Sequence, residues 1–263
     1  LELTARRLGY RRVFSGDADI GGRFSVFSPF GLVPAALLGV DILKLAERGR
    51  RAARACRTAD ATANPGARLG TILAVAARAG RDKQRFVMPL IIVSFGAWLE
   101  QLLAESTGKE GQGLLPLVRQ LAAPHNKSWA DALEISIGLG RDSTETEALG
   151  NETDAPVIAI SLEDRYDIGY QFFLWEMATA VAGHILQINP FDQPNVAASK
   201  KKTEAVLASR GGAGGRSSEL KADIHGLRDF LKSVRPGDYI ALQAFIAPAE
   251  DNAAALRRLA DKL

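Results

Sequence analysis

Three short runs rich in β-branched and other apolar residues most constrain what this 263-residue chain can fold into. They lie at 84–93, 113–118 and 156–162, and each has the composition of a buried strand. Helical patterns, in which apolar residues recur every three or four positions, alternate with them. Buried strands that alternate with helices through short connections predict an α/β fold, with a mostly parallel sheet covered on both faces.

The helical patterns are predicted at 34–59, with a break near Gly49, and at 65–80, 94–106, 170–186, 195–210 and 217–234. Pro65 suits the first turn of its helix, Ser94 is the predicted N-cap of the next helix, and Ser217 or Ser218 is predicted to cap the last one. Further short strands are predicted at 11–14 and 237–246. The polar, charge-mixed segment 124–154 is interpreted as irregular.

Both ends of the chain have a helical pattern, without an initiator methionine at the start or a capping glycine at the end. We therefore expect this sequence to be a piece of a longer chain. The glycine-rich stretch 210–216 could suggest a phosphate-binding loop. It follows a helix instead of a strand and lacks the lysine and hydroxyl spacing, so it is interpreted as a flexible linker.

Composition argues against several classes of partner. The chain has 33 basic and 30 acidic residues, a formal net charge of +3, so no nucleic-acid partner is expected. The arginines of 47–57 fall on one face of a helix and the alanines on the other, as on a solvated helix. The longest apolar run, 86–99, is too short for a bilayer span, and the single Cys56 and the lack of a signal peptide indicate a cytoplasmic protein.

Three stretches carry polar residues that neither periodicity nor turn chemistry requires; in such sheets, functional residues are expected outside the carboxyl ends of strands. The first is "DADIGGRFSVFSPFG" (17–31), where two glycines precede Arg23. Glycines allow a tight turn and close approach of a ligand, and a guanidinium supplies a permanent, forked cation. A turn with a structural arginine, paired with a neighbouring carboxylate, explains this motif equally well.

The second stretch, "QLLAESTGKEG" (101–111), ends a helical run. Gln101 and Glu105 are four residues apart, so they share a helix face. A helix C-terminus favours cations, so a carboxylate there calls for an explanation, although a surface glutamate remains the alternative. The third stretch, "INPFDQPNVAASKKK" (188–202), places Gln193 in a turn and Lys200 two turns into the next helix. By itself it reads as an ordinary helix N-terminal turn.

Taken together, "DIGGRFSVFSPFG", "QLLAESTGKEG" and "FDQPNVAASK" resemble the signature segments of phosphoglucose isomerases, and they occur in that family's order. The resemblance runs from about residue 9 to about residue 200. It is closest to the isomerase module of bacterial transaldolase/phosphoglucose isomerase fusions. It implies an SIS-type three-layer α/β/α sandwich, truncated at both ends. Residues 1–60 would end an N-terminal subdomain with its connecting helices, and 61–263 would form an incomplete second one.

The resemblance also implies the interconversion of glucose 6-phosphate and fructose 6-phosphate without a metal or an organic cofactor, in a cytoplasmic homodimer. Glu105 matches the general base that moves a proton between C1 and C2. Arg23, after Gly22, matches the arginine beside the cis-enediol. Lys200 matches the lysine near the site of ring opening. Gln101 and Gln193 match amides that contact the substrate.

Two parts of the family's pattern are not found. Nothing upstream of residue 17 matches a phosphate-binding loop, and none of the three histidines lies in the expected His-x-x-Gly-Gln-like context. His125 is interpreted as a loop residue, His184 as a core histidine and His225 as solvated. We therefore expect little activity from residues 1–263 alone. A non-catalytic sugar-phosphate-binding SIS module remains the alternative, and so does part of a bifunctional transaldolase/isomerase.

Overall fold

The computed structural model describes residues 2–120, 130–140, 155–192, 194–210 and 224–260, the last range with gaps at 236–237, 239, 241–243, 245 and 248. The chain forms two compact units, Leu1–Ala198 and Ser199–Leu263. The first unit contains the sheet, and each unit is considered by itself. The domain boundary predicted near residue 60 stays a prediction.

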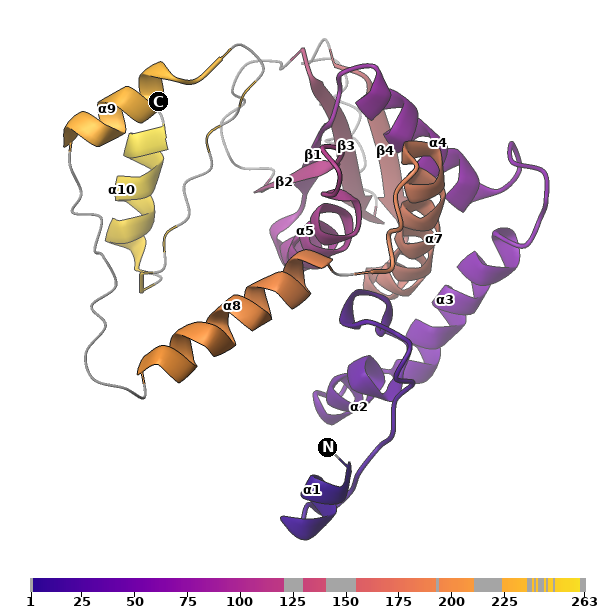
Figure 1. Cartoon of the computed structure of the whole chain (residues 1–263). Helices are drawn as coiled ribbons and strands as arrows, with labels where there is room; N and C mark the ends of the chain where they lie inside the picture. Colours follow the sequence, from indigo (N-terminus) through magenta and orange to yellow (C-terminus); the bar gives the residue numbers. More distant parts are fainter. Residues whose placement is uncertain are drawn as a thin grey trace. The chain divides into compact units, whose positions relative to one another are not determined.

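The sheet of the first unit has four parallel strands in the order β2-β1-β3-β4 (Figure 1). Their bounds are Lys83–Met88 for β1, Leu115–Gln120 for β2, Ala132–Leu139 for β3 and Val157–Leu162 for β4. The sheet is flanked by helices, so the predicted α/β class is confirmed. Strand β1 ends at Met88 because Pro89 has no N–H to continue the ladder.

Two strand predictions are corrected. The segment interpreted as irregular contains β3, whose sequence "ALEISIGL" alternates apolar and polar residues. Its polar positions include Glu134, which is buried and forms an ion pair with buried Arg85 on β1. Conversely, residues 11–14 form no strand and have no ladder partner. The strand predicted at 237–246 falls mainly outside the described residues, and those described within it carry no strand.

The helices of the first unit are α1 (Glu2–Arg7), α2 (Pro29–Leu37), α3 (Ile42–Ala55), α4 (Pro65–Arg78), α5 (Val93–Thr107) and α7 (Ile168–Leu186), with short 3₁₀ turns η1 (Gly22–Phe24), η2 (Leu90–Ile92) and η4 (Arg165–Asp167). Helix α8 (Pro194–Arg210) runs across the boundary of the two units, and α9 (Ile224–Lys232) and α10 (Glu250–Ala260) belong to the second. Within the described residues, no helix has the length and apolar character needed to cross a membrane.

Helix positions largely agree with the predictions, but two details differ. The break in 34–59 lies at 38–41, where Asp41 caps α3 through its side chain, and not at Gly49. Gly49 lies within α3. The Phe27 ring packs against it and explains the glycine, because an added Cβ would lie 2.5 Å from Cζ of that ring. Ser94 does not cap α5, since Ile92 is the N-cap residue. Ser217 and Ser218 lie outside the described residues.

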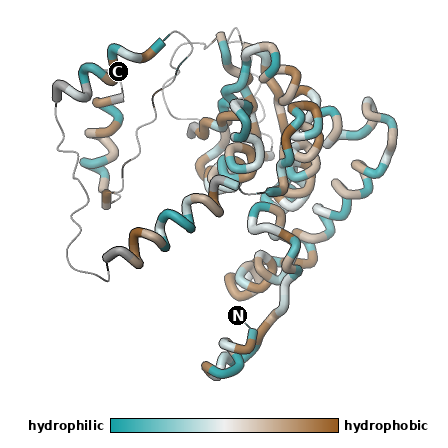
Figure 2. Tube along the Cα trace, viewed as in Figure 1, coloured by the Kyte–Doolittle hydropathy of each residue, from teal (hydrophilic) through white to brown (hydrophobic). Residues whose placement is uncertain are grey.

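The core lies where α4, α5 and α7 pack together beside the sheet, and Figure 2 shows brown, apolar stretches along these helices. Its centre includes Phe86 of β1 and Trp175 of α7, whose ring centroids are 5.4 Å apart. Leu99 and Leu103 of α5 are fully buried in the same cluster. This packing fixes the direction of α5 and therefore the place of its C-terminal turn.

Helix α7 also carries a mostly buried acid, Glu176, whose Oε1 atom finds no hydrogen-bond partner among the described residues. Burial raises the pKa of Glu176 from about 4.5 to about 7. Between these values the folded state holds a proton that the unfolded state has released, so stability falls as the pH rises. We expect the free energy of unfolding of Glu176→Gln, measured by urea unfolding at pH 8, to exceed that of the wild type by about 2 kcal/mol. This difference should disappear toward pH 4.5. A pH-independent gap would contradict this.

Candidate active site

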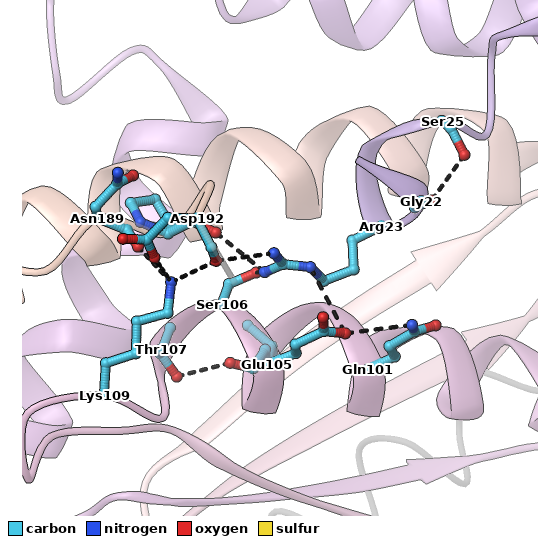
Figure 3. Close-up of polar contacts among 12 residues, drawn as sticks. Gly22, Arg23, Ser25, Gln101, Glu105, Ser106, Thr107, Lys109, Asn189 and Asp192 are labelled. Atoms are coloured by element: carbon cyan, nitrogen blue, oxygen red, sulfur yellow. Dashed lines mark hydrogen bonds and ion pairs between the residues drawn. The ribbon is translucent and has the colours of Figure 1, made fainter. Parts of the chain in front are cut away.

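Parts of all three quoted stretches meet at the C-terminal end of α5 (Figure 3). Arg23 comes from η1, and Glu105 and Ser106 come from the last turn of α5. The loop 189–192, which follows α7, closes the third side of the cluster. Segments far apart in the sequence therefore build one polar cluster within the first unit.

Local turn chemistry explains how Arg23 is presented. The carbonyl of Gly22 accepts hydrogen bonds from the Ser25 hydroxyl at 2.7 Å and from the Ser25 N–H at 3.2 Å, which closes the short η1 turn. The Arg23 side chain then points toward α5 and is buried, with 1% of it exposed. The tight turn expected from the two glycines is thus present, and it directs the arginine inward.

The guanidinium of Arg23 uses most of its donors on protein groups. Nη1 donates to the Ser106 hydroxyl and, at 3.0 Å, to the Pro190 carbonyl, while Nη2 donates to the Asp192 carbonyl at 3.3 Å. Nε lies 3.7 Å from Oε2 of Glu105 and makes no hydrogen bond within the described part of the chain. A buried donor without a hydrogen bond is costly, so this N–H is available to an acceptor of a bound molecule.

Burial lowers the pKa of Arg23, and the nearby carboxylates of Glu105 and Asp192 act in the opposite direction. An arginine starts from a pKa so high that it stays protonated at neutral pH. The cluster therefore holds a fixed cation beside a carboxylate. This also explains Glu105 at a helix C-terminus, because the guanidinium compensates for the unfavourable helix end.

Glu105 and Gln101 share a helix face, as their spacing predicts. Nε2 of Gln101 donates to Oε2 of Glu105 at 3.3 Å. The Glu105 side chain is 24% exposed, so its carboxylate is held on one side and open to solvent on the other. Such a group can accept a proton from a bound molecule.

The structure does not test the roles of the other predicted site residues. Lys200 is exposed on α8 and belongs to the second unit. Gln193 lies outside the described residues. Gly22 is exposed and adjoins Arg23 in the η1 turn. Roles for these three residues stay predictions.

The histidine interpretations have separate outcomes. His184 is exposed near the end of α7, so its interpretation as a core histidine is wrong. Helix α7 is apolar on more than one face, and periodicity alone could not tell which face is buried. His125 lies outside the described residues, and His225 is on α9 with its side chain undescribed.

Three further residues of the cluster lie within the quoted stretches but were not assigned to the site from the sequence: Ser106, Lys109 and Asp192. Ser106 is fully buried, and it follows Leu99 by seven residues and Leu102 by four. Helical periodicity therefore placed this hydroxyl on the buried stripe of α5, where a polar group needs a partner. Lys109 and Asp192 form an ion pair across the cluster, a contact that local pattern does not reveal.

The cluster lies toward the amino end of the sheet, because α5 runs back from the end of β1 to the start of β2. The Thr107 hydroxyl accepts from the N–H of Leu114, at 2.8 Å, directly before β2 begins. The expectation that functional residues lie outside the carboxyl ends of the strands is therefore wrong for this cluster.

The described residues contain no group of three His, Cys, Asp or Glu side chains that could hold a metal ion.

Gly22 offers a test of ligand approach to the cluster. Among the described residues, chain neighbours aside, no heavy atom lies within 4 Å of the position that a Cβ would take at Gly22, and its backbone conformation suits any residue. Gly22→Ala is therefore expected to leave the thermal unfolding midpoint unchanged, and to weaken about tenfold the binding of fructose 6-phosphate, the ligand that the sequence resemblance implies, if that ligand passes close to this backbone. Titration followed by NMR measures this. Unchanged affinity would remove Gly22 from the site.

Comparison with known proteins bears on this geometry. No family model matches the chain. Glucose-6-phosphate isomerase of Pediococcus pentosaceus is 28% identical over 247 residues, covering 78% of this chain and 55% of that protein. The enzyme of the same name from Clostridioides difficile is 29% identical over 254 residues, covering 80% and 56%. The chain is a distant homologue of glucose-6-phosphate isomerases. It spans about half the length of these curated relatives.

Solved structures agree at the level of the fold. A glucose-6-phosphate isomerase from Chlamydia trachomatis has a TM-score of 0.59 at 16% identity, over 81% of this chain and 50% of that one. A hypothetical protein from Thermus thermophilus has a TM-score of 0.67 at 22% identity, over 78% of this chain and 60% of that one. At these identities the likeness shows the fold alone.

Proposed function

We propose that this chain is an aldose–ketose isomerase module that interconverts glucose 6-phosphate and fructose 6-phosphate through a cis-enediol(ate). The observation that carries the proposal is the pairing of Glu105 with a buried Arg23 whose Nε donor has no hydrogen-bond partner among the described residues. Distant homology to glucose-6-phosphate isomerases supports the same reaction.

In this proposal Glu105 is the general base. A proton on the carbon next to a carbonyl is weakly acidic, so its removal needs a carboxylate held within hydrogen-bond reach. Glu105 takes the proton from C2 of the open-chain aldose and returns it to C1, while the proton of the C2 hydroxyl passes to the C1 oxygen, which gives the ketose. The Gln101 amide, at 3.3 Å from the carboxylate, restricts its rotation while the outer side remains open to the sugar.

Arg23 stabilises the negative charge that develops on the enediolate oxygens. Its guanidinium is already fixed by Ser106 and by carbonyls of the loop 189–192, so little reorganisation is needed during the reaction. The Nε of Arg23, which makes no hydrogen bond among the described residues, supplies a further donor to these oxygens. A preorganised donor of this kind is worth on the order of 3 kcal/mol in comparable oxyanion sites.

Lys200, Gln193 and Gly22 complete the proposal. Lys200 would assist ring opening, Gln193 would contact the sugar hydroxyls, and the sugar would pass close to the Gly22 backbone. We also propose that the full-length protein is a cytoplasmic homodimer that needs no metal or organic cofactor. Participation in a bifunctional transaldolase/isomerase is compatible with this assignment.

Proton exchange in D₂O tests the proposal. It detects slow turnover, which is needed because the chain spans about half the length of its relatives. The chain is mixed with fructose 6-phosphate, and NMR follows the loss of a C1 proton and the appearance of glucose 6-phosphate. We expect C1 exchange above the rate in buffer. Saturable binding without exchange would indicate a non-catalytic sugar-phosphate-binding module instead. Neither binding nor exchange would overturn the proposal.

A further inference from the structure

The turn that follows α5 holds Lys109 in a defined place. Lys109 donates its N–H to Thr107 O at 2.8 Å and accepts from the N–H of Gln112 at 2.8 Å, across a reversal at Glu110 and Gly111 with φ angles of 53° and 74°. The Thr107 hydroxyl donates to Leu103 O at 2.7 Å, which ties the turn back onto α5. The backbone of Lys109 is therefore fixed relative to Glu105, which lies in the last turn of α5.

The side chain of Lys109 is directed into the protein and is 6% exposed. It donates to Asn189 O, to Asp192 O at 2.8 Å and to the Asp192 carboxylate. An ammonium has three donors, and here three oxygen acceptors match them. All three belong to one loop about 80 residues further along the chain. Lys109 is thus committed to this loop, unlike Arg23, whose Nε makes no hydrogen bond within the described residues.

The same loop is held from its other side by Arg23. Arg23 donates to Pro190 O at 3.0 Å and to Asp192 O at 3.3 Å, so the Asp192 carbonyl accepts from both cations (Figure 3). The rings of Phe24 and Phe191 pack with their centroids 5.2 Å apart. The Asp192 carboxylate offsets the second positive charge that Lys109 brings to the cluster.

We propose that Lys109 is a positioning residue of the candidate active site, which fixes the loop 189–192 against Arg23 and thereby sets where α8 begins. The inference rests on the proposed function, because only then does the position of this loop beside Arg23 matter to a substrate. It explains the "STGKEG" stretch as the turn that directs the Lys109 side chain toward the loop 189–192. It also assigns Asp192 to holding Lys109 and leaves substrate contact to other residues.

Hydrogen–deuterium exchange of Lys109→Met tests this without requiring activity. Methionine keeps the length of the side chain and removes the three donors. We expect amides of residues 188–198 to exchange about tenfold faster or more, since charged hydrogen bonds are lost, while β1 and β3 keep their protection. Lys109→Arg should restore most of the protection. Lys83→Met is the matched control, because Lys83 is also buried but forms ion pairs with Asp82 and Asp131, at 2.8 and 3.0 Å.

Binding of fructose 6-phosphate forms the second readout. We expect Lys109→Met to weaken it about tenfold, and Lys109→Arg to bind within a few-fold of the wild type. Equal loss of protection in 188–198 and in β1 and β3 would indicate a general loss of stability and overturn the inference. Asp192→Asn removes the same ion pair from the other side and tests the inference if Lys109→Met does not fold. It should raise amide exchange in 188–198 and leave that of β1 and β3 unchanged. Failure of the wild type to bind the sugar would count against the proposed function, whereas the exchange result would still decide whether Lys109 fixes the loop.

Discussion

Replacing Glu105 by glutamine is expected to remove proton exchange and isomerisation while leaving the fold intact. A positioned general base contributes about 10²–10⁴-fold in rate, and glutamine has the same shape but cannot take the proton. The Glu105 side chain is partly exposed and its contact with Arg23 is 3.7 Å long, so we expect the loss of folding stability to be under about 1 kcal/mol. The exchange assay in D₂O and urea unfolding measure the two effects separately.

Glu100→Gln is the matched control for this variant. Glu100 lies on the same helix, five residues earlier, and is exposed. The Glu100→Gln variant removes the same charge outside the cluster, so its proton-exchange rate should equal that of the wild type. If Glu105→Gln keeps the wild-type rate, Glu105 is not the base, and the site has to be sought elsewhere in the chain.

Replacing Arg23 by methionine is expected to damage both stability and activity. The Ser106 hydroxyl and two loop carbonyls lose their donor, and Glu105 loses its cation. Unsatisfied buried groups cost about 1–3 kcal/mol each, so we expect a total loss of a few kcal/mol in urea unfolding. Arg23→Lys keeps the charge but not the planar fork, so it should regain part of the stability while proton exchange stays about 10²-fold or more below the wild type.

Arg48→Met separates the role of the cluster from the general cost of losing a buried arginine. The Arg48 side chain is 15% exposed and pairs with Asp167 at 2.8 Å, in another part of the first unit. It should lower stability without changing the proton-exchange rate of the folded protein. A wild-type exchange rate in folded Arg23→Lys would show that the guanidinium geometry does not serve the reaction.

The difference between prediction and structure is clear in β3. Its alternation of apolar and polar residues was present in the sequence, but the charge of Glu134 and the polar surroundings favoured an irregular segment. Glu134 is tolerated in a buried strand because Arg85 of β1 lies beside it in the register, and the two form an ion pair. The partner that makes the strand possible comes from another strand, so local pattern could not supply it.

The candidate site divides in the same way. The four-residue spacing of Gln101 and Glu105 was sufficient to place them on one helix face, and their hydrogen bond follows from that spacing. Nothing local joined Arg23 to Ser106, which is 83 residues away, or Lys109 to the loop 189–192. A lysine in a polar turn normally extends into solvent, so the burial of Lys109 had no signal in its neighbourhood.

By itself, the sequence determined the α/β class, most helices, three of the four strands and the face shared by Gln101 and Glu105. These properties depend on residues within a few positions of one another, through periodicity, capping and the limits that proline and glycine place on the backbone. Only the tertiary structure decided that Arg23 would be buried beside Glu105 and that Lys109 would hold a distant loop. Those contacts depend on how α5, η1 and the loop after α7 pack, and packing brings together groups whose separation in sequence carries no pattern.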